Sequence, residues 1–196
     1  MEFESLAEIV EYCRRERKDM AEAMVDYEMR NKGISREEVF AHLKRVLLVM
    51  EESVDQGLTQ QFITPSGMLN NWAKKVHDAP RETLGSALKK AVARAIAVGE
   101  VNACMGRIAA APTAGSAGIM PAVLVTMLEE HGIPRERLLL GLLVSSAVGL
   151  IFARHSSFAG SEAGCMGETG SAAAMGAATI VYLLGGTEDQ ILEAVG

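Results

Sequence analysis

LLLGLLVSSAVGLIFA, residues 138–153, is a run of sixteen residues without a charged side chain. A membrane-spanning helix needs about 20 apolar residues, and Arg135, Arg137 and Arg154 prevent this run from being extended. A helix buried on all sides within a soluble core is therefore the better interpretation. We predict an all-α fold, in which residues 1–196 form a single domain of packed helices around this buried apolar helix.

Hydrophobic periodicity predicts that helices also form the rest of the chain. One helix is predicted over residues 5–30 and ends near Gly33, and the next opens with a capping box at Ser35 and Glu38 and closes at Gly57. The pattern then predicts, in order, a loop over residues 58–71, a short helix over 72–76, helices over 83–98 and 119–130, and a capped helix from Thr187. One risk to the all-α prediction is TIVYLL, residues 179–184, which has the composition of a strand.

The stretch SSFAGSEAGCMGETGSAAAM, residues 156–175, combines four glycines with one cysteine, Cys165. Glycines at this density leave backbone N–H groups uncovered, and residues 171–178 are predicted to form a helix whose first turn faces the glycine loop. This arrangement would favour binding of an anion next to the thiolate of Cys165. The alternative is a flexible glycine loop around a buried, inert cysteine.

Composition limits the classes of function. The net charge of −6 and the lack of a basic run beyond CRRERK, residues 13–18, argue against nucleic acid as a partner. Three cysteines at wide spacings fit a reducing cytoplasm better than a disulfide framework, and the N-terminus lacks the features of a signal peptide. We therefore expect a cytoplasmic protein without a membrane partner. Nucleotide-binding and structural zinc motifs are absent from the sequence.

Three blocks of sequence carry a family resemblance: EVNACMGRIAAAPTAGSAGIMPAVL (100–124), GSEAGCMGETGSAAAM (160–175) and LLGGTEDQ (183–190). On these blocks the chain resembles the iron-sulfur-dependent L-serine dehydratases, in particular the α chain of the two-subunit bacterial form. The resemblance implies conversion of L-serine to pyruvate and ammonia, a separate β subunit, and no pyridoxal phosphate. It also implies a [4Fe–4S] cluster on three cysteines, one of which is Cys165. The other two follow in the family in Cys-Asp-Pro and Val-Pro-Cys segments, which residues 1–196 do not contain.

The resemblance therefore describes residues 1–196 as an α-chain-like domain that is incomplete at its C-terminus. We expect this chain by itself to fold but to hold no cluster and have no activity, because one thiolate does not hold a [4Fe–4S] cluster. Cys13 lies in the predicted N-terminal helix, and Cys104 is the one cysteine that could approach Cys165. The last helix is expected to fray and to expose an apolar patch that drives homodimer formation. Three interpretations of residues 1–196 remain open: they are a piece of a longer protein, one part of a split protein, or a degenerate relative of the family.

Candidate site residues come from two of the blocks. Thr113 or Ser116 could cap the helix predicted over residues 119–130, or the N-terminus of that helix could receive the substrate carboxylate. The resemblance favours substrate binding, with the candidates Thr113, Gly115, Ser116 and Gly164. The general base is not assigned, and its weak candidates are Glu168, Ser157 and His155. For Glu168 a helix cap or ion pair is the alternative, and for His155 a structural role. A cysteine desulfidase and an inactive scaffold or interaction subunit are the alternative functions.

Overall fold

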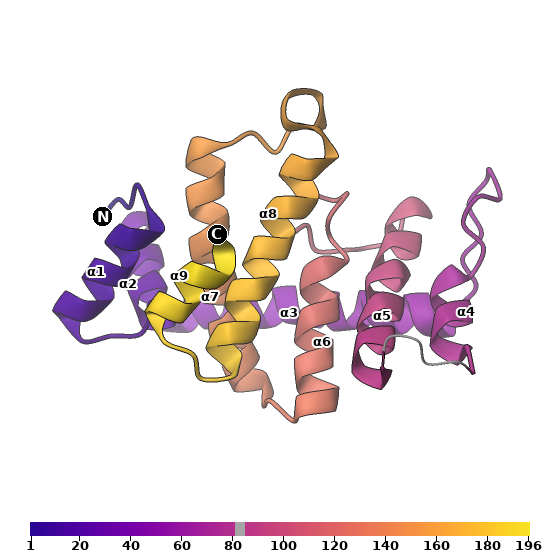
Figure 1. Cartoon of the computed structure of the whole chain (residues 1–196), viewed down its shortest axis with the longest axis horizontal. Coiled ribbons are helices and arrows are strands. Elements are labelled where there is room, and N and C mark those ends of the chain that lie inside the picture. Colours follow the sequence, from indigo (N-terminus) through magenta and orange to yellow (C-terminus); the bar gives the residue numbers. More distant parts are fainter. Residues whose placement is uncertain (81–84) are drawn as a thin grey trace. The chain divides into compact units, whose positions relative to one another are not determined.

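The computed structural model describes residues 1–80 and 85–196, and it confirms the all-α prediction. Within these residues there is no strand, only an isolated bridge between Ile63 and Asn70, and residues 179–183 lie in helix α8 with Leu184 as its C-cap. The helices are α1 (Leu6–Glu16), α2 (Met20–Lys32), α3 (Arg36–Thr59), α4 (Trp72–Asp78), α5 (Ser86–Ala103), α6 (Ile119–His131), α7 (Arg135–His155), α8 (Gly160–Leu183) and α9 (Glu188–Val195) (Figure 1). The start predicted at Thr83 for the fifth helix lies outside the described residues.

The chain divides into two compact units, which we describe separately. Unit 1 comprises Met1–Arg45 with Ile133–Gly196, and unit 2 comprises Val46–Gly132. The sequence predicts a single domain, and the number of domains stays a prediction.

The N-terminal part of unit 1 forms two helices where the sequence predicts one. Arg17 takes a left-handed conformation with φ 55°, and Asp19 caps α2 by accepting a hydrogen bond of 2.8 Å from the backbone nitrogen of Glu22. A run of polar residues here offers no apolar face that would hold one straight helix against the fold. The capping box at Ser35 and Glu38 is confirmed, since each residue's backbone nitrogen donates to the other's side chain.

Helix α7 contains the apolar run of residues 138–153 and packs against α1, α2 and α8 of unit 1. Two glycines allow α8 to approach closely: a Cβ atom at Gly141 would lie 3.1 Å from Thr179, and one at Gly149 would lie 3.3 Å from Met175. Its buried residues lie between 138 and 148, whereas Arg135, Glu136 and Ser146 are exposed and residues 149–152 are half-buried, so the prediction of a helix buried on all sides is wrong. In the described part of the chain, α7 is the one helix long and apolar enough to cross a membrane by length and composition. Half of the residues in its most apolar window are buried, and core helices of soluble proteins also meet these criteria of length and composition.

Asp19 also joins the two sequence segments of unit 1. Its Oδ2 atom accepts a hydrogen bond of 3.0 Å from the hydroxyl of Tyr182, near the end of α8. The guanidinium of Arg137 lies over the ring of Tyr182 and donates to its carbonyl oxygen. Burial, reinforced by the charge of Asp19 and the hydrogen bond to it, raises the pKa of Tyr182. This hydroxyl therefore remains protonated and serves as a donor.

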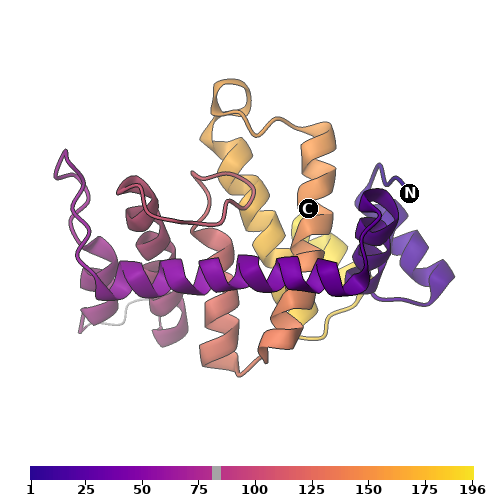
Figure 2. The same ribbon diagram turned by 180° about the vertical axis from the view of Figure 1, so that it is seen from behind.

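Unit 2 is built from α4, α5, α6 and the second part of α3. Figure 2 shows α3 as one uninterrupted helix, so the prediction that Gly57 ends it is wrong. Gly57 is needed for packing instead, since a Cβ atom there would lie 2.4 Å from the carbonyl oxygen of Ala97 in α5. Unit 2 also contains a small hydrophobic cluster, formed by Val54, Val98, Ala117 and Val125 with Leu58 and Ile108 packed against it.

The predicted loop and short helix after α3 are confirmed in unit 2. Residues 60–71 form a narrow turn in which Thr64 and Asn71 donate backbone hydrogen bonds to Leu69 and Phe62. Helix α4 follows directly at Trp72.

Candidate functional site

The candidate residues fall into two groups. His155, Ser157, Gly164, Cys165 and Glu168 belong to unit 1, whereas Thr113, Gly115 and Ser116 belong to unit 2. Each group is a local arrangement of its own unit.

Cys165 lies in a helix and not in the predicted glycine loop. Helix α8 is interrupted once, at Gly164, whose φ of 65° and ψ of −177° are not helical. Residues 160–163 therefore form a single turn, and the main part of α8 begins at Cys165 (Figure 1). Such a conformation is essentially restricted to glycine, which explains why this position needs one. The thiol of Cys165 is exposed at the start of the main helix, where first-turn N–H groups lie nearby.

Gly167 allows the segment between α7 and α8 to lie against this helix. This segment, residues 156–159, contains Ser157 and is called the connector below. A Cβ atom at Gly167 would lie 3.1 Å from the carbonyl oxygen of Ser157 and 2.5 Å from the Cβ of Ala163. Gly167 thus lets both the connector and the single turn approach the helix that begins at Cys165. Sequence reasoning placed this glycine in a glycine loop around Cys165, because its helical conformation depends on the surrounding fold.

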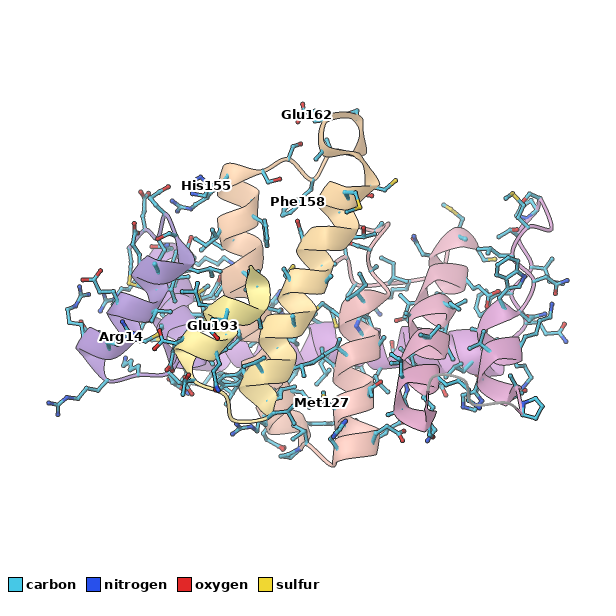
Figure 3. The ribbon with its side chains drawn as sticks, viewed as in Figure 1. Arg14, Met127, His155, Phe158, Glu162 and Glu193 are labelled. Atoms are coloured by element: carbon cyan, nitrogen blue, oxygen red, sulfur yellow. The ribbon has the colours of Figure 1, made fainter. Side chains whose placement is uncertain are left out.

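The three candidates for the general base have different environments. The Ser157 hydroxyl accepts a hydrogen bond of 3.1 Å from the backbone nitrogen of Ala159, within the connector. His155 is exposed at the end of α7 (Figure 3), and its Nε2 atom lies 2.6 Å from the carbonyl oxygen of Glu4. Glu168 is half-buried and lies three residues after Cys165, one turn along the same helix.

In unit 2, Thr113 and Ser116 close a tight turn before α6. Their hydroxyl oxygens are 3.1 Å apart, and the backbone nitrogen of Ser116 donates to the Thr113 hydroxyl. Neither side chain caps α6, which begins after Gly118 without a side-chain cap, so that predicted role is wrong. Gly118 occupies the N-cap position instead. A side chain does not fit there, because a Cβ atom at Gly118 would lie 2.4 Å from the carbonyl oxygen of Ala95. Gly115 is exposed at the tip of the turn.

The three cysteines differ in their availability as metal ligands. Cys13 is buried in α1, and burial, with smaller contributions from Glu188 and Asp19, raises the pKa of its thiol to about 12. Cys104 is half-buried in unit 2 and Cys165 is exposed in unit 1. Within residues 1–80 and 85–196, no group of three His, Cys, Asp or Glu side chains is placed to hold a metal ion. The residues present therefore do not fit a complete iron-sulfur site, although Cys165 is accessible as one ligand.

Comparisons with known proteins agree with the three sequence blocks. The family model for "Serine dehydratase alpha chain" matches residues 8–196. "L-serine dehydratase, alpha chain" of Peptoniphilus asaccharolyticus is 39% identical over 190 residues, which cover 95% of this chain and 65% of that protein. "Probable L-serine dehydratase, alpha chain" of Bacillus subtilis (strain 168) is 34% identical over 196 residues, which cover 98% of this chain and 65% of that protein. The chain thus spans 65% of the length of these two relatives.

Proposed function

Because the chain belongs to the serine dehydratase alpha chain family, we propose that it is the α-subunit portion of an iron-sulfur L-serine ammonia-lyase. This enzyme converts L-serine to pyruvate and ammonia, and the relatives named L-serine dehydratase support that reaction. The observation that carries the proposal is the position of Cys165, an exposed thiol at the point where α8 restarts after Gly164. We further propose a separate β subunit, as the words "alpha chain" in the relatives' names suggest.

Dehydration of serine breaks a Cα–H bond of low acidity and expels hydroxide, a poor leaving group. A [4Fe–4S] cluster, if bound, would supply Lewis-acid assistance to such a reaction. In this proposal Cys165 contributes one of three thiolates, and the other two come from outside residues 1–196. Pyridoxal phosphate has no role in it.

This chain's own residues have the following proposed roles. Glu168 is the preferred base for the α-proton, because the Ser157 hydroxyl and the His155 ring already have partners in the connector and at Glu4. A base one helical turn from the cluster ligand could reach a substrate bound beside it. Thr113, Gly115 and Ser116 of unit 2, which precede the uncapped start of α6, are proposed substrate-binding residues for the serine carboxylate. Gly164 of unit 1 is proposed as a substrate-binding residue on the family resemblance.

The test uses the complete gene product, purified anaerobically with its β subunit and supplied with iron and sulfide. Pyruvate, ammonia and sulfide are measured with L-serine and with L-cysteine as substrates. We expect pyruvate from serine, loss of both the cluster absorbance and the activity in Cys165→Ser, and near-normal values in the control Cys104→Ser. A Glu168→Gln variant is expected to keep the cluster but to lose turnover.

Two other results would replace the proposal with one of its alternatives. Sulfide release from cysteine without turnover of serine would identify a cysteine desulfidase. A folded complex that binds no iron and turns over neither serine nor cysteine would identify a scaffold or interaction subunit.

A further inference from the structure

The N-terminal segment, residues 1–5, is packed firmly against unit 1. Phe3 is buried, with its ring edge-on to Tyr12 at 5.6 Å and stacked on Tyr27 at 5.9 Å. Aromatic pairs at these separations are favourable beyond the apolar area that they bury. The side-chain amide of Asn31 donates a hydrogen bond of 2.7 Å to the carbonyl oxygen of Met1. Met1 and Phe3 are therefore both held in place, and Glu4 lies between Phe3 and α1.

Glu4 bonds to two helices through three different groups. Its backbone nitrogen donates a hydrogen bond of 2.9 Å to the carboxylate of Glu8 in α1. Its carbonyl oxygen lies 2.6 Å from His155 Nε2, and since a carbonyl can only accept, that ring nitrogen carries the proton. Its carboxylate pairs with the guanidinium of Arg154. The last two residues of α7 thus both bind one residue near the start of the chain, and Arg154 is in addition hydrogen-bonded to Tyr27 of α2.

The end of α7 in turn places the connector that leads to Cys165. The backbone nitrogen of Ser156 still donates to the carbonyl oxygen of Phe152, so helical hydrogen bonding reaches the first connector residue, whose own backbone is extended. The next carbonyl, that of Ser157, lies against Gly167 in the first turn after Cys165. Figure 3 labels His155 at the end of α7 and Phe158 on the connector. A shift of the α7 terminus would therefore reach the turn that carries the cysteine through one carbonyl contact.

We propose that Glu4 is a positioning residue for Cys165: by holding Arg154 and His155, it fixes the connector and the orientation of the thiol. The importance of Cys165 rests on the proposed function, whereas the mechanical link does not. Glu4 touches no substrate in this proposal and acts only through α7.

The link is tested on the chain of residues 1–196 in a Cys104→Ser background, so that Cys165 is the accessible thiol. The rate of its reaction with a disulfide reagent and the hydrogen exchange of residues 156–165 are compared in the parent, Glu4→Gln and Arg154→Met. We expect both rates to change in each variant by about two- to fivefold, the range that a partly exposed ion pair supports. In the double variant Glu4→Gln/Arg154→Met the change should match that of Arg154→Met alone, because Arg154→Met already removes the pair with Glu4 together with the hydrogen bond to Tyr27.

A matched control separates positioning from general stability. Asp189→Asn removes another exposed ion pair of unit 1, the one between Arg14 of α1 and Asp189 of α9. It should lower the melting temperature as much as Glu4→Gln does while leaving the Cys165 rate unchanged. Equal Cys165 rates in the parent and in Glu4→Gln, or an equal change in Asp189→Asn, would overturn the proposal. Because no cluster or serine is used, this result is independent of whether the complete enzyme proves to be a lyase.

Discussion

The buried carboxylate of Glu100 in α5 lies 2.7 Å from the backbone nitrogen of Trp72, the first residue of α4. Its second oxygen accepts from the backbone nitrogen of Ala73 at 3.1 Å. The residue before α4, Asn71, has a left-handed backbone, and its side chain bonds to Phe62 instead of capping the helix. A carboxylate from a distant part of the sequence thus supplies the cap that α4 lacks locally.

Replacing this cap should destabilise unit 2. In Glu100→Gln an amide NH₂ would face a backbone N–H donor, so we expect a loss of about 1–3 kcal/mol in the free energy of unfolding. Urea unfolding followed by circular dichroism measures the change, and Trp72 fluorescence reports the start of α4. The exposed Glu11→Gln in α1 is the control and should change stability little. Equal stabilities of the two variants would contradict the capping role.

Acid should weaken the contact between α5 and α6. Lys90 donates to both oxygens of Glu130 at 3.0 Å, and this hydrogen bond, helped by Arg94, lowers the pKa of that carboxyl below its ordinary value of 4.5. Such a group stabilises the fold fully above its unfolded pKa, and the contribution is lost as the pH falls through the folded pKa. The parent should therefore melt at a higher temperature than Glu130→Gln at pH 7. That difference should shrink progressively below pH 4.5 in thermal unfolding, and a difference that persists in strong acid would refute the assignment.

Two helical glycines of unit 2 should respond oppositely to alanine. A Cβ atom at Gly57 would meet the Ala97 carbonyl oxygen at 2.4 Å, so Gly57→Ala must separate α3 from α5, at a cost of about 1–3 kcal/mol. A Cβ atom at Gly99 in α5 would instead point into open space, with no neighbour within 4 Å, and Gly99→Ala should stabilise by about 0.5–1 kcal/mol. Melting temperatures of the two variants provide the measurement. A neutral Gly57→Ala would show that the helices are not packed as described.

The interruption of α8 gives a parallel pair in unit 1. Gly164→Ala places a Cβ on a backbone with φ 65°, which should cost about 1–3 kcal/mol or force the turn before Cys165 to rearrange. Gly170, on the same helix, has open space around it, so Gly170→Ala serves as the control and should stabilise. Unfolding in urea and the reaction rate of the Cys165 thiol are both measured. If the two variants were equally stable, the break at Gly164 would be wrong.

The features that sequence reasoning found depend on near neighbours along the chain. The capping boxes at Ser35 and at Thr187 with Gln190 use residues three apart, so a local pattern identifies them. The apolar run of α7 likewise indicates its own burial. The family resemblance located Cys165, although the surrounding residues gave only the glycines and a single thiol.

The missed features depend on contacts between distant segments. Gly57 looked like a helix end because its role is set by Ala97, which the local pattern does not contain. Three of the four glycines around Cys165 are helical, and only Gly164 uses its freedom to adopt a positive φ. Glu100 gave no signal at all, since a carboxylate capping another helix has no fixed spacing from it.

The hydrogen bond between Tyr182 and Asp19 has a consequence for synthesis on the ribosome, because the whole of Val46–Gly132 is made between its two partners. At about 5–20 residues per second, residues 1–45 wait on the order of ten seconds before α7 and α8 emerge to cover them. We expect α1 and α2 of the nascent chain to be open to protease and to chaperones during this interval, as limited proteolysis of stalled ribosome complexes can measure. Unit 2 is contiguous in sequence and faces no comparable delay.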